Sequence, residues 1–194
     1  MIPFTKAAAT AERPSAYYVP AVWSEIAERL ALHGIRLEKL DQTTDVEVEM
    51  YRLPEAKLAE SRNPFEGHAR VDPGPLEIEE TVLSLAPGSW RVPTDQPLGD
   101  LAMLLLEPES PDSYFQWGFM LEILNRTEYV EAYVMEPMAA RMLEEDAELA
   151  AEFRQKLLSD REFAGDPRAR LQWFYEKTPF YDREHLRYPI ARER

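Results

Sequence analysis

Alternating apolar and polar side chains predict strands in the first half of the chain. Residues 46–53 alternate strictly, with apolar side chains on one face and acidic ones on the other, as in a half-buried antiparallel strand. Residues 76–85 and 90–93 flank the turn sequence Ala-Pro-Gly-Ser and together predict a β-hairpin. Shorter runs predict further strands at residues 16–19, 35–40 and 68–71.

One helix is predicted among these strands, over residues 21–33. Its apolar side chains recur every four residues at Val22, Ile26 and Leu30, which places them in one stripe along the helix. Gly34 follows and is expected to end the helix, because glycine readily adopts the left-handed conformation found after a last helical turn.

From residue 93 onward, apolar periodicity and capping signals predict helices. Either Asp95 or Gln96 can cap a helix that begins at Pro97, since proline at the first helical position has no N–H to lose. The sequence Ser-Pro-Asp-Ser at residues 110–113 repeats this signal before an apolar, core-forming helix that ends near Leu124. Further helices are predicted at 128–145 with an interruption or kink at Pro137, at 147–158 capped by Asp146, and from Pro167 capped by Asp166. Between the last two, Ser159 is predicted to cap a short turn that runs to Ala164.

These elements predict an α+β fold, in which a mostly antiparallel N-terminal sheet with one early helix precedes a helical C-terminal half. Residues 1–15 have no periodicity and are expected to be a flexible lead-in or linker, which fits a cut made between domains. Residues 16–194 are expected to form a single domain, sheet-rich over 16–93 and helix-rich over 94–194, and the aperiodic residues 178–194 to wrap back over it.

Charge and composition exclude several classes of partner. The net charge of −14, from 22 basic and 36 acidic side chains, argues against nucleic acid and against an anionic membrane surface. No cysteine is present, so disulfides and cysteine-based zinc sites are excluded. The first fifteen residues lack the apolar region of a signal peptide, and the longest apolar run, 101–106, is far shorter than the ~20 residues of a membrane span. The compartment stays open.

Local catalytic motifs are absent. Neither His33 nor His185 is followed by a histidine or carboxylate at the helical spacing of a zinc site, and Asp72, four residues after His68, lies in a predicted turn rather than on a helix. His33 lies at the end of its predicted helix, where a cation is favourable. Gly-x-Ser-x-Gly and glycine-rich phosphate loops are also missing. An independent hydrolase would need His68 or His185 to meet carboxylates from elsewhere in the chain.

A polar, proline-rich segment at 93–118 holds the candidate binding residues. These are Asp95, Gln96, Asp112, Ser113 and Trp117. One interpretation is a ligand- or partner-facing surface beside the core. The other is two successive helix caps and a core tryptophan.

Three runs of this sequence resemble a known family. They are residues 88–98 (GSWRVPTDQPL), residues 105–113 (LLEPESPDS) and residues 116–119 (QWGF). Further matches lie at residues 30–35, 64–68, 128–131, 134–139, 166–171 and 174–175. Over roughly residues 14–190, the chain resembles the C-terminal region of bacterial zinc carboxypeptidase-like metallopeptidases of the carboxypeptidase A superfamily.

Such peptidases hold zinc with a His-x-x-Glu pair and a distant histidine, and a glutamate activates the zinc-bound water. None of these motifs occurs here, since His33, His68 and His185 are followed by Gly-Ile-Arg, Ala-Arg-Val and Leu-Arg-Tyr. The resemblance therefore implies a non-catalytic C-terminal portion, with zinc held only in an upstream catalytic domain. It assigns no catalytic residue, no metal ligand and no cofactor to this chain.

Two function hypotheses follow. In the first, the chain is an accessory domain of a zinc metallocarboxypeptidase and is not an enzyme by itself. Its partner would be the upstream peptidase domain of the same protein, together with the peptide substrate, and residues 93–118 would make the contact. In the second, it is a stand-alone acidic module that binds a basic peptide or protein.

Overall fold

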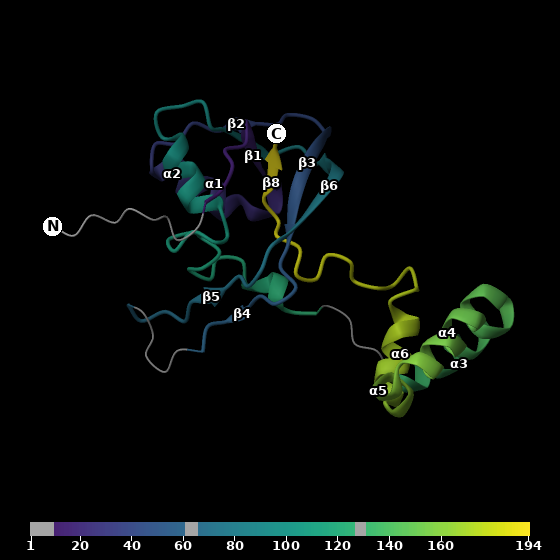
Figure 1. The fold of residues 1–194 in the computed structure, drawn as a ribbon. Coiled ribbons are helices and arrows are strands. Elements are labelled where there is room, and N and C mark those ends of the chain that lie inside the picture. The colour runs from purple at the N-terminus through teal and green to yellow at the C-terminus, as the bar shows by residue number, and fades with distance from the viewer. Residues whose placement is uncertain (1–9, 61–65, 127–130) are drawn as a thin grey trace. The chain divides into compact units, whose positions relative to one another are not determined.

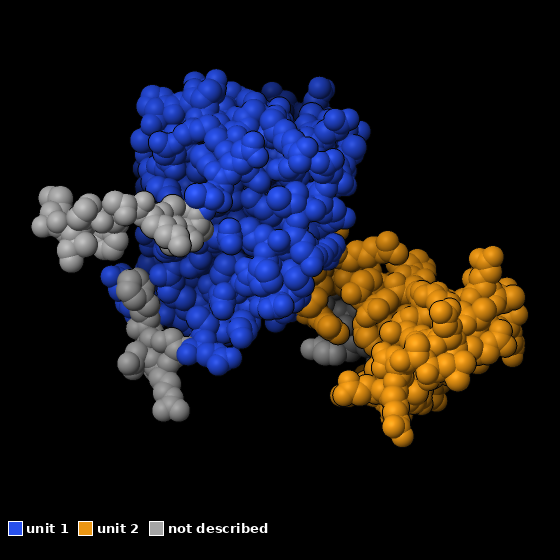
Figure 2. Space-filling view, viewed as in Figure 1, with its two compact units in different colours: residues 1–125, 186–194 blue, residues 126–185 orange. Residues whose placement is uncertain are grey.

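The computed structural model describes residues 10–60, 66–126 and 131–194 (Figure 1). It confirms the α+β class, with an antiparallel sheet and an early helix in the N-terminal half and helices in the C-terminal half. The chain divides into two compact units, coloured separately in Figure 2. Unit 1 comprises residues 1–125 and 186–194, and unit 2 comprises residues 126–185. A single domain over 16–194 stays a prediction.

Unit 1 is organised around one antiparallel sheet of six strands, in the order β2-β7-β1-β8-β3-β6. Its strands are β1 (Ala16–Val19), β2 (Glu38–Lys39), β3 (Thr44–Arg52), β6 (Glu77–Leu85), β7 (Trp90–Pro93) and β8 (Ala191–Glu193). The short strands β4 (Lys57–Leu58) and β5 (Val71–Asp72) pair separately. Strand β8 lies between β1 and β3, so the aperiodic C-terminal segment completes the middle of the sheet.

The predicted hairpin of residues 76–85 and 90–93 is wrong. The turn forms, with the Ser89 N–H donating to the Ala86 carbonyl, but β6 pairs with β3 along its whole length and β7 pairs with β1 and β2. A turn reverses the direction of the chain, but it does not determine which strands pair with the strands on either side of it. Here the partner follows from burial, because β7 places the fully buried Val92 opposite the buried Tyr17 of β1.

Helix α1 (Ser24–Leu32) packs the predicted apolar stripe against the main core, except for Val22, the first residue of that stripe. Ile26 and Leu30 are buried, whereas Val22 is 82% exposed because it belongs to the preceding 3₁₀ turn η1 (Ala21–Trp23) and points elsewhere. Gly34 adopts a positive φ of 83°, as expected after the helix end.

Helix α2 (Gly99–Leu106) begins two residues later than predicted. Neither Asp95 nor Gln96 caps it with a side chain; Leu98 occupies the N-cap position, and the Gly99 N–H donates to the backbone carbonyl of Gln96 at 2.9 Å. Leu105 is buried in the core, but Leu104 is 56% exposed.

The predicted helix before Leu124 is also wrong, since this segment forms successive turns and the 3₁₀ helix η2 (Leu121–Leu124). Gly118 has a positive φ of 81°, and the N–H groups of Gly118 and Phe119 donate to the carbonyls of Phe115 and Tyr114. This Schellman pattern ends a single helical turn. The segment nevertheless enters the core, because Phe115 is fully buried.

Unit 2 consists of α3 (Ala132–Glu145), α4 (Ala147–Ser159), α5 (Arg161–Gly165) and α6 (Pro167–Tyr175). Asp146 and Asp166 cap α4 and α6 as predicted, and α5 is capped by Asp160 rather than by Ser159. Pro137 lies inside α3, which continues through it. The predicted first residues of this helix, 128–130, lie outside the described residues. Among the described residues, no helix is long and apolar enough to cross a membrane.

Candidate functional site

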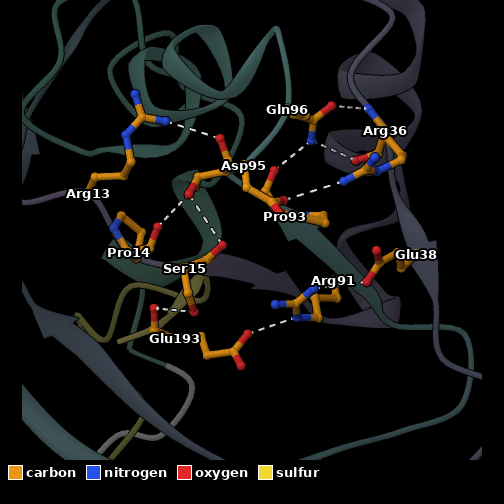
Figure 3. Close-up of polar contacts among 11 residues, drawn as sticks. Arg13, Pro14, Ser15, Arg36, Glu38, Arg91, Pro93, Asp95, Gln96 and Glu193 are labelled. Atoms are coloured by element: carbon orange, nitrogen blue, oxygen red, sulfur yellow. Dashed lines mark hydrogen bonds and ion pairs between the residues drawn. The ribbon is translucent and has the colours of Figure 1, made fainter.

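Gln96 uses its side-chain amide entirely on backbone groups. Its Oε1 accepts from the Arg36 N–H at 2.7 Å, and its Nε2 donates to the carbonyls of Arg36 at 3.1 Å and Pro93 at 2.6 Å (Figure 3). The neighbouring Asp95 is exposed, with Oδ1 3.4 Å from an Arg36 guanidinium nitrogen. Gln96 therefore holds the loop after α1 against the end of β7.

Thr94, beside Gln96, fixes the segment that precedes β1. It is buried, its hydroxyl donates to the Pro14 carbonyl at 2.6 Å, and its N–H donates to the Ser15 carbonyl at 3.0 Å. The Arg13 guanidinium donates a hydrogen bond to the Thr94 carbonyl (Figure 3). Arg13 also pairs with Asp100 of α2. The run Val-Pro-Thr-Asp-Gln-Pro thus joins three segments that are distant in sequence.

The other candidate residues lie on a second turn. Ser113 is fully buried and its Oγ accepts from the Gln116 N–H at 3.2 Å, while Asp112 is exposed. The half-buried Trp117 packs edge-on against His68, with ring centroids 5.7 Å apart, and its ring centroid lies 5.6 Å from the Arg70 guanidinium. Asp95 and Gln96 therefore contact the loop after α1, whereas Trp117 contacts the segment before β5.

A groove of about 920 Å³ lies beside α2 in unit 1. None of the five candidate residues lines it, but it is lined by the neighbouring motif residues Glu107, Glu109, Ser110, Pro111 and Gln116. Val71, Met103 and the exposed Leu104 form an apolar part of its lining. The groove can therefore receive an apolar side chain beside polar and charged groups.

Sequence reasoning missed a buried polar cluster next to this groove. The sheet register places Tyr17 of β1, Arg192 of β8 and Glu49 of β3 in one transverse row on the same face. At the end of α2, Glu107 meets this face with only 6% of its surface exposed. It accepts from the Tyr17 hydroxyl at 2.5 Å and from the Tyr51 hydroxyl at 2.9 Å.

Two ion pairs compensate the buried charges of this cluster. The Arg192 Nε lies 3.3 Å from Glu107 Oε1, and its Nη1 donates to Glu49 Oε2 at 3.3 Å. Burial, and then the negative charge of Glu107, raise the pKa of Tyr17 and of Tyr51 above the ordinary tyrosine value. Both tyrosines therefore stay protonated and serve as hydrogen-bond donors.

The cluster is suited to structure rather than to proton transfer. Both Glu107 oxygens are engaged by Tyr17, Tyr51 and Arg192, which leaves the carboxylate poorly placed to accept a substrate proton. In unit 2, His185 lines a groove of about 710 Å³ with Glu136 and Asp182 among its neighbours. Over residues 10–60, 66–126 and 131–194, no three His, Cys, Asp or Glu side chains are grouped so that they could hold a metal ion.

Comparison with curated proteins shows a relationship to carboxypeptidases. The chain is 31% identical over 111 residues to "Carboxypeptidase 2" of Trichophyton rubrum, a match that covers 57% of this chain and 20% of that protein. The protein of the same name from Trichophyton tonsurans is 30% identical over 113 residues, covering 58% and 20%. The match thus covers about a fifth of the length of these curated relatives. No family model and no solved structure matches the chain. The chain therefore contains a carboxypeptidase-related region.

Proposed function

We propose that this chain is a non-catalytic accessory domain of a zinc carboxypeptidase-like metallopeptidase, placed C-terminal to the catalytic domain. It packs on that domain or shapes access of the peptide substrate to it. The zinc ion belongs to the catalytic domain. Neither a nucleic acid nor a membrane is a partner.

The observation that carries this proposal is the partial match. The region related to "Carboxypeptidase 2" covers 20% of the length of those proteins, which is compatible with a domain associated with a carboxypeptidase. The described histidines and carboxylates offer no metal-binding group, and Glu107 is saturated by internal partners. Both features favour a role beside a catalytic centre.

The groove beside α2 is the surface that we assign to the contact. Several of its lining residues belong to the segment 93–118, and Leu104 presents 56% of its surface there. Together with Met103 and Val71, it gives a partner's apolar side chain a surface to pack against. The internal bonds of Gln96 and Thr94 hold the start of this helix in place.

The test measures zinc content and carboxypeptidase activity of the 194-residue chain alone, and again with the peptidase domain from the same gene. We expect no zinc and no hydrolysis from the chain alone, and binding or altered turnover on mixing. Stoichiometric zinc or hydrolysis by the chain alone would overturn the accessory role.

Leu104→Asp examines the docking surface. Moving the aspartate charge from water into an apolar contact costs free energy, so binding of the peptidase domain should weaken at least about tenfold. Val22→Asp is the matched control, because Val22 is 82% exposed and does not line the groove. Equal loss of binding in both variants would place the contact elsewhere.

A further inference from the structure

The transverse row that crosses the sheet ends in two carboxylates. Arg192 of β8 lies opposite Glu49 of β3, and Glu49 lies opposite Glu80 of β6. Two acids directly opposite each other repel, so this end of the row needs a cation. Arg192 pairs with Glu49 from inside the protein.

The second cation comes from Arg194, which follows β8. Its guanidinium pairs with Glu49 and lies 2.8 Å from a Glu80 oxygen. The Glu49 side chain is 10% exposed, whereas those of Glu80 and Arg194 are each 70% exposed. Glu49 and Glu80 thus form a pair of carboxylates that binds a guanidinium group. In this chain the group belongs to Arg194, which is mostly exposed and is held mainly by these ion pairs.

This pair borders a groove of about 810 Å³ along β3 and β6. Glu47 and Val82, which lie opposite each other in the next row, also line it. Arg194 also lines this groove, so the arginine that pairs with Glu49 and Glu80 lies at the protein surface.

Strand β6 forms one edge of the six-stranded sheet, and among the described residues it pairs with β3 alone (Figure 1). Its other edge therefore offers backbone N–H and C=O groups over a strand of nine residues. Ile78, Glu80 and Val82 alternate along one face of it, and Ile78 and Val82 are 58% and 64% exposed.

We propose that this edge binds an extended basic segment of a partner protein as a seventh strand. The segment carries an arginine between two aliphatic side chains at alternate positions. The arginine takes the place of Arg194 between Glu49 and Glu80, and the aliphatic side chains pack on Ile78 and Val82. Backbone hydrogen bonds to the β6 edge supply affinity, and this side-chain pattern supplies specificity.

A second copy of the chain is a poor occupant of the edge. β6 contains three glutamates and no basic residue, so an antiparallel pair of β6 strands would bring two acidic strands together and add no cation to the arginine that each copy already supplies. A partner of opposite charge satisfies both the acidic pair and the free edge. The inference holds whether or not a peptidase domain docks at the groove beside α2, because the two surfaces share no lining residue.

The test uses the peptide Thr-Val-Thr-Arg-Thr-Val-Thr-amide, labelled at its N-terminus with the zwitterionic dye tetramethylrhodamine so that the arginine gives it a net positive charge; it is titrated with the full chain and followed by fluorescence anisotropy. We expect binding that weakens with added salt, and at least about tenfold weaker binding of the same peptide with glutamine in place of arginine. Amide hydrogen exchange should slow in β6 but not at the other edge strand, β2.

Three variants make the outcome decisive. Glu80→Gln should weaken binding about tenfold, whereas Glu77→Gln, an exposed acid on the other face of the same strand, should change it less than about twofold. Arg194→Ala removes the internal competitor and should tighten binding about threefold. Absence of binding, equal binding of the glutamine peptide, or weaker binding of Arg194→Ala would overturn the proposal. So would dimers of the chain alone that protect β6.

Discussion

The two units of this chain are stabilised by contacts of very different range in sequence. In unit 1, β1, β7 and β8 lie side by side although they come from residues 16–19, 90–93 and 191–193. In unit 2, consecutive helices pack on one another, and three aspartates, Asp146, Asp160 and Asp166, cap the helices that directly follow them. The sheet of unit 1 is therefore held together by segments that are distant in sequence, whereas the helices of unit 2 pack on helices that are closer to them in sequence.

The interiors of the two units also differ in chemistry. Unit 1 buries the carboxylate of Glu107 against Tyr17, Tyr51 and Arg192 within a large apolar core. Unit 2 has a small core in which Phe153 lies 4.7 Å from Phe174 between ring centroids. Removing one member of a buried charge network leaves an uncompensated charge, whereas a small and partly buried apolar core has fewer contacts to lose. This difference predicts where substitutions are most damaging.

Glu107→Gln is expected to have the largest effect. It removes one of the two carboxylate charges that compensate the buried Arg192 and should lower the free energy of unfolding by about 3–5 kcal/mol. Urea unfolding measures the loss, and hydrogen exchange should locate it in unit 1. Glu109→Gln, an exposed acid on the same segment, should stay within about 0.5 kcal/mol of the parent. A loss below about 1 kcal/mol for Glu107→Gln would mean that the stability of unit 1 does not depend on the charge of this buried cluster.

Gly99→Ala comes next. A Cβ at Gly99 would overlap the backbone carbonyl of Thr94, which cannot move freely because Thr94 is tied to Pro14 and Ser15. We expect a loss of about 2–3 kcal/mol in thermal or urea unfolding.

The matched change in unit 2 is Gly165→Ala. No atom of the described residues lies within 4 Å of the position that a Cβ would take at Gly165, and this residue ends helix α5. Alanine restricts the unfolded chain, so this variant should gain about 0.5 kcal/mol. A comparable loss at both glycines would remove the contrast between a tightly packed and an open unit.

The same contrast explains what the sequence could predict. Asp146 and Asp166 identified their helices because a cap acts on N–H groups two or three residues away. The hairpin of β6 and β7 was wrong because strand partners depend on distant burial, and the helix before Leu124 was wrong because Gly118 reverses the backbone.

The candidate site shows the same limit. Gln96 and Thr94 stand in a distinctive run, yet their backbone partners in the segments at Arg36 and Pro14 follow only from the folded chain. The cluster at Glu107 left no local signal, since Tyr17 is 90 residues away in sequence. Arg192 joins the cluster only because β8 pairs with β1 and places Arg192 opposite Tyr17.

Alkaline pH should weaken unit 1 specifically. Burial raises the pKa of Tyr17, Tyr51 and Tyr188, so above about pH 10 the unfolded chain loses protons that the folded chain retains. The stabilisation is complete below the unfolded pKa and is lost as pH rises beyond it, at up to about 1.4 kcal/mol per pH unit for each tyrosine.

Urea unfolding between about pH 9 and about pH 11 checks this slope. The slope of the free energy of unfolding against pH should be shallower in Tyr17→Phe, by the amount that corresponds to about one proton. Tyr133→Phe, at a ring of unit 2 that is 77% exposed, should leave the slope as in the parent. A slope that is unchanged in Tyr17→Phe would show that its hydroxyl is accessible to solvent.

A further small effect is expected in unit 2, at the cap of α4. Asp146 Oδ1 accepts from the N–H groups of Glu148 and Leu149, both at 2.9 Å. Asp146→Ala should cost about 1 kcal/mol, seen as faster hydrogen exchange in the first turn of α4 with unit 1 unchanged. Asp146→Asn keeps an acceptor oxygen and should lose only a few tenths of a kcal/mol. If asparagine loses as much as alanine, the charge at the helix N-terminus, rather than the hydrogen bonds, stabilises this end of the helix.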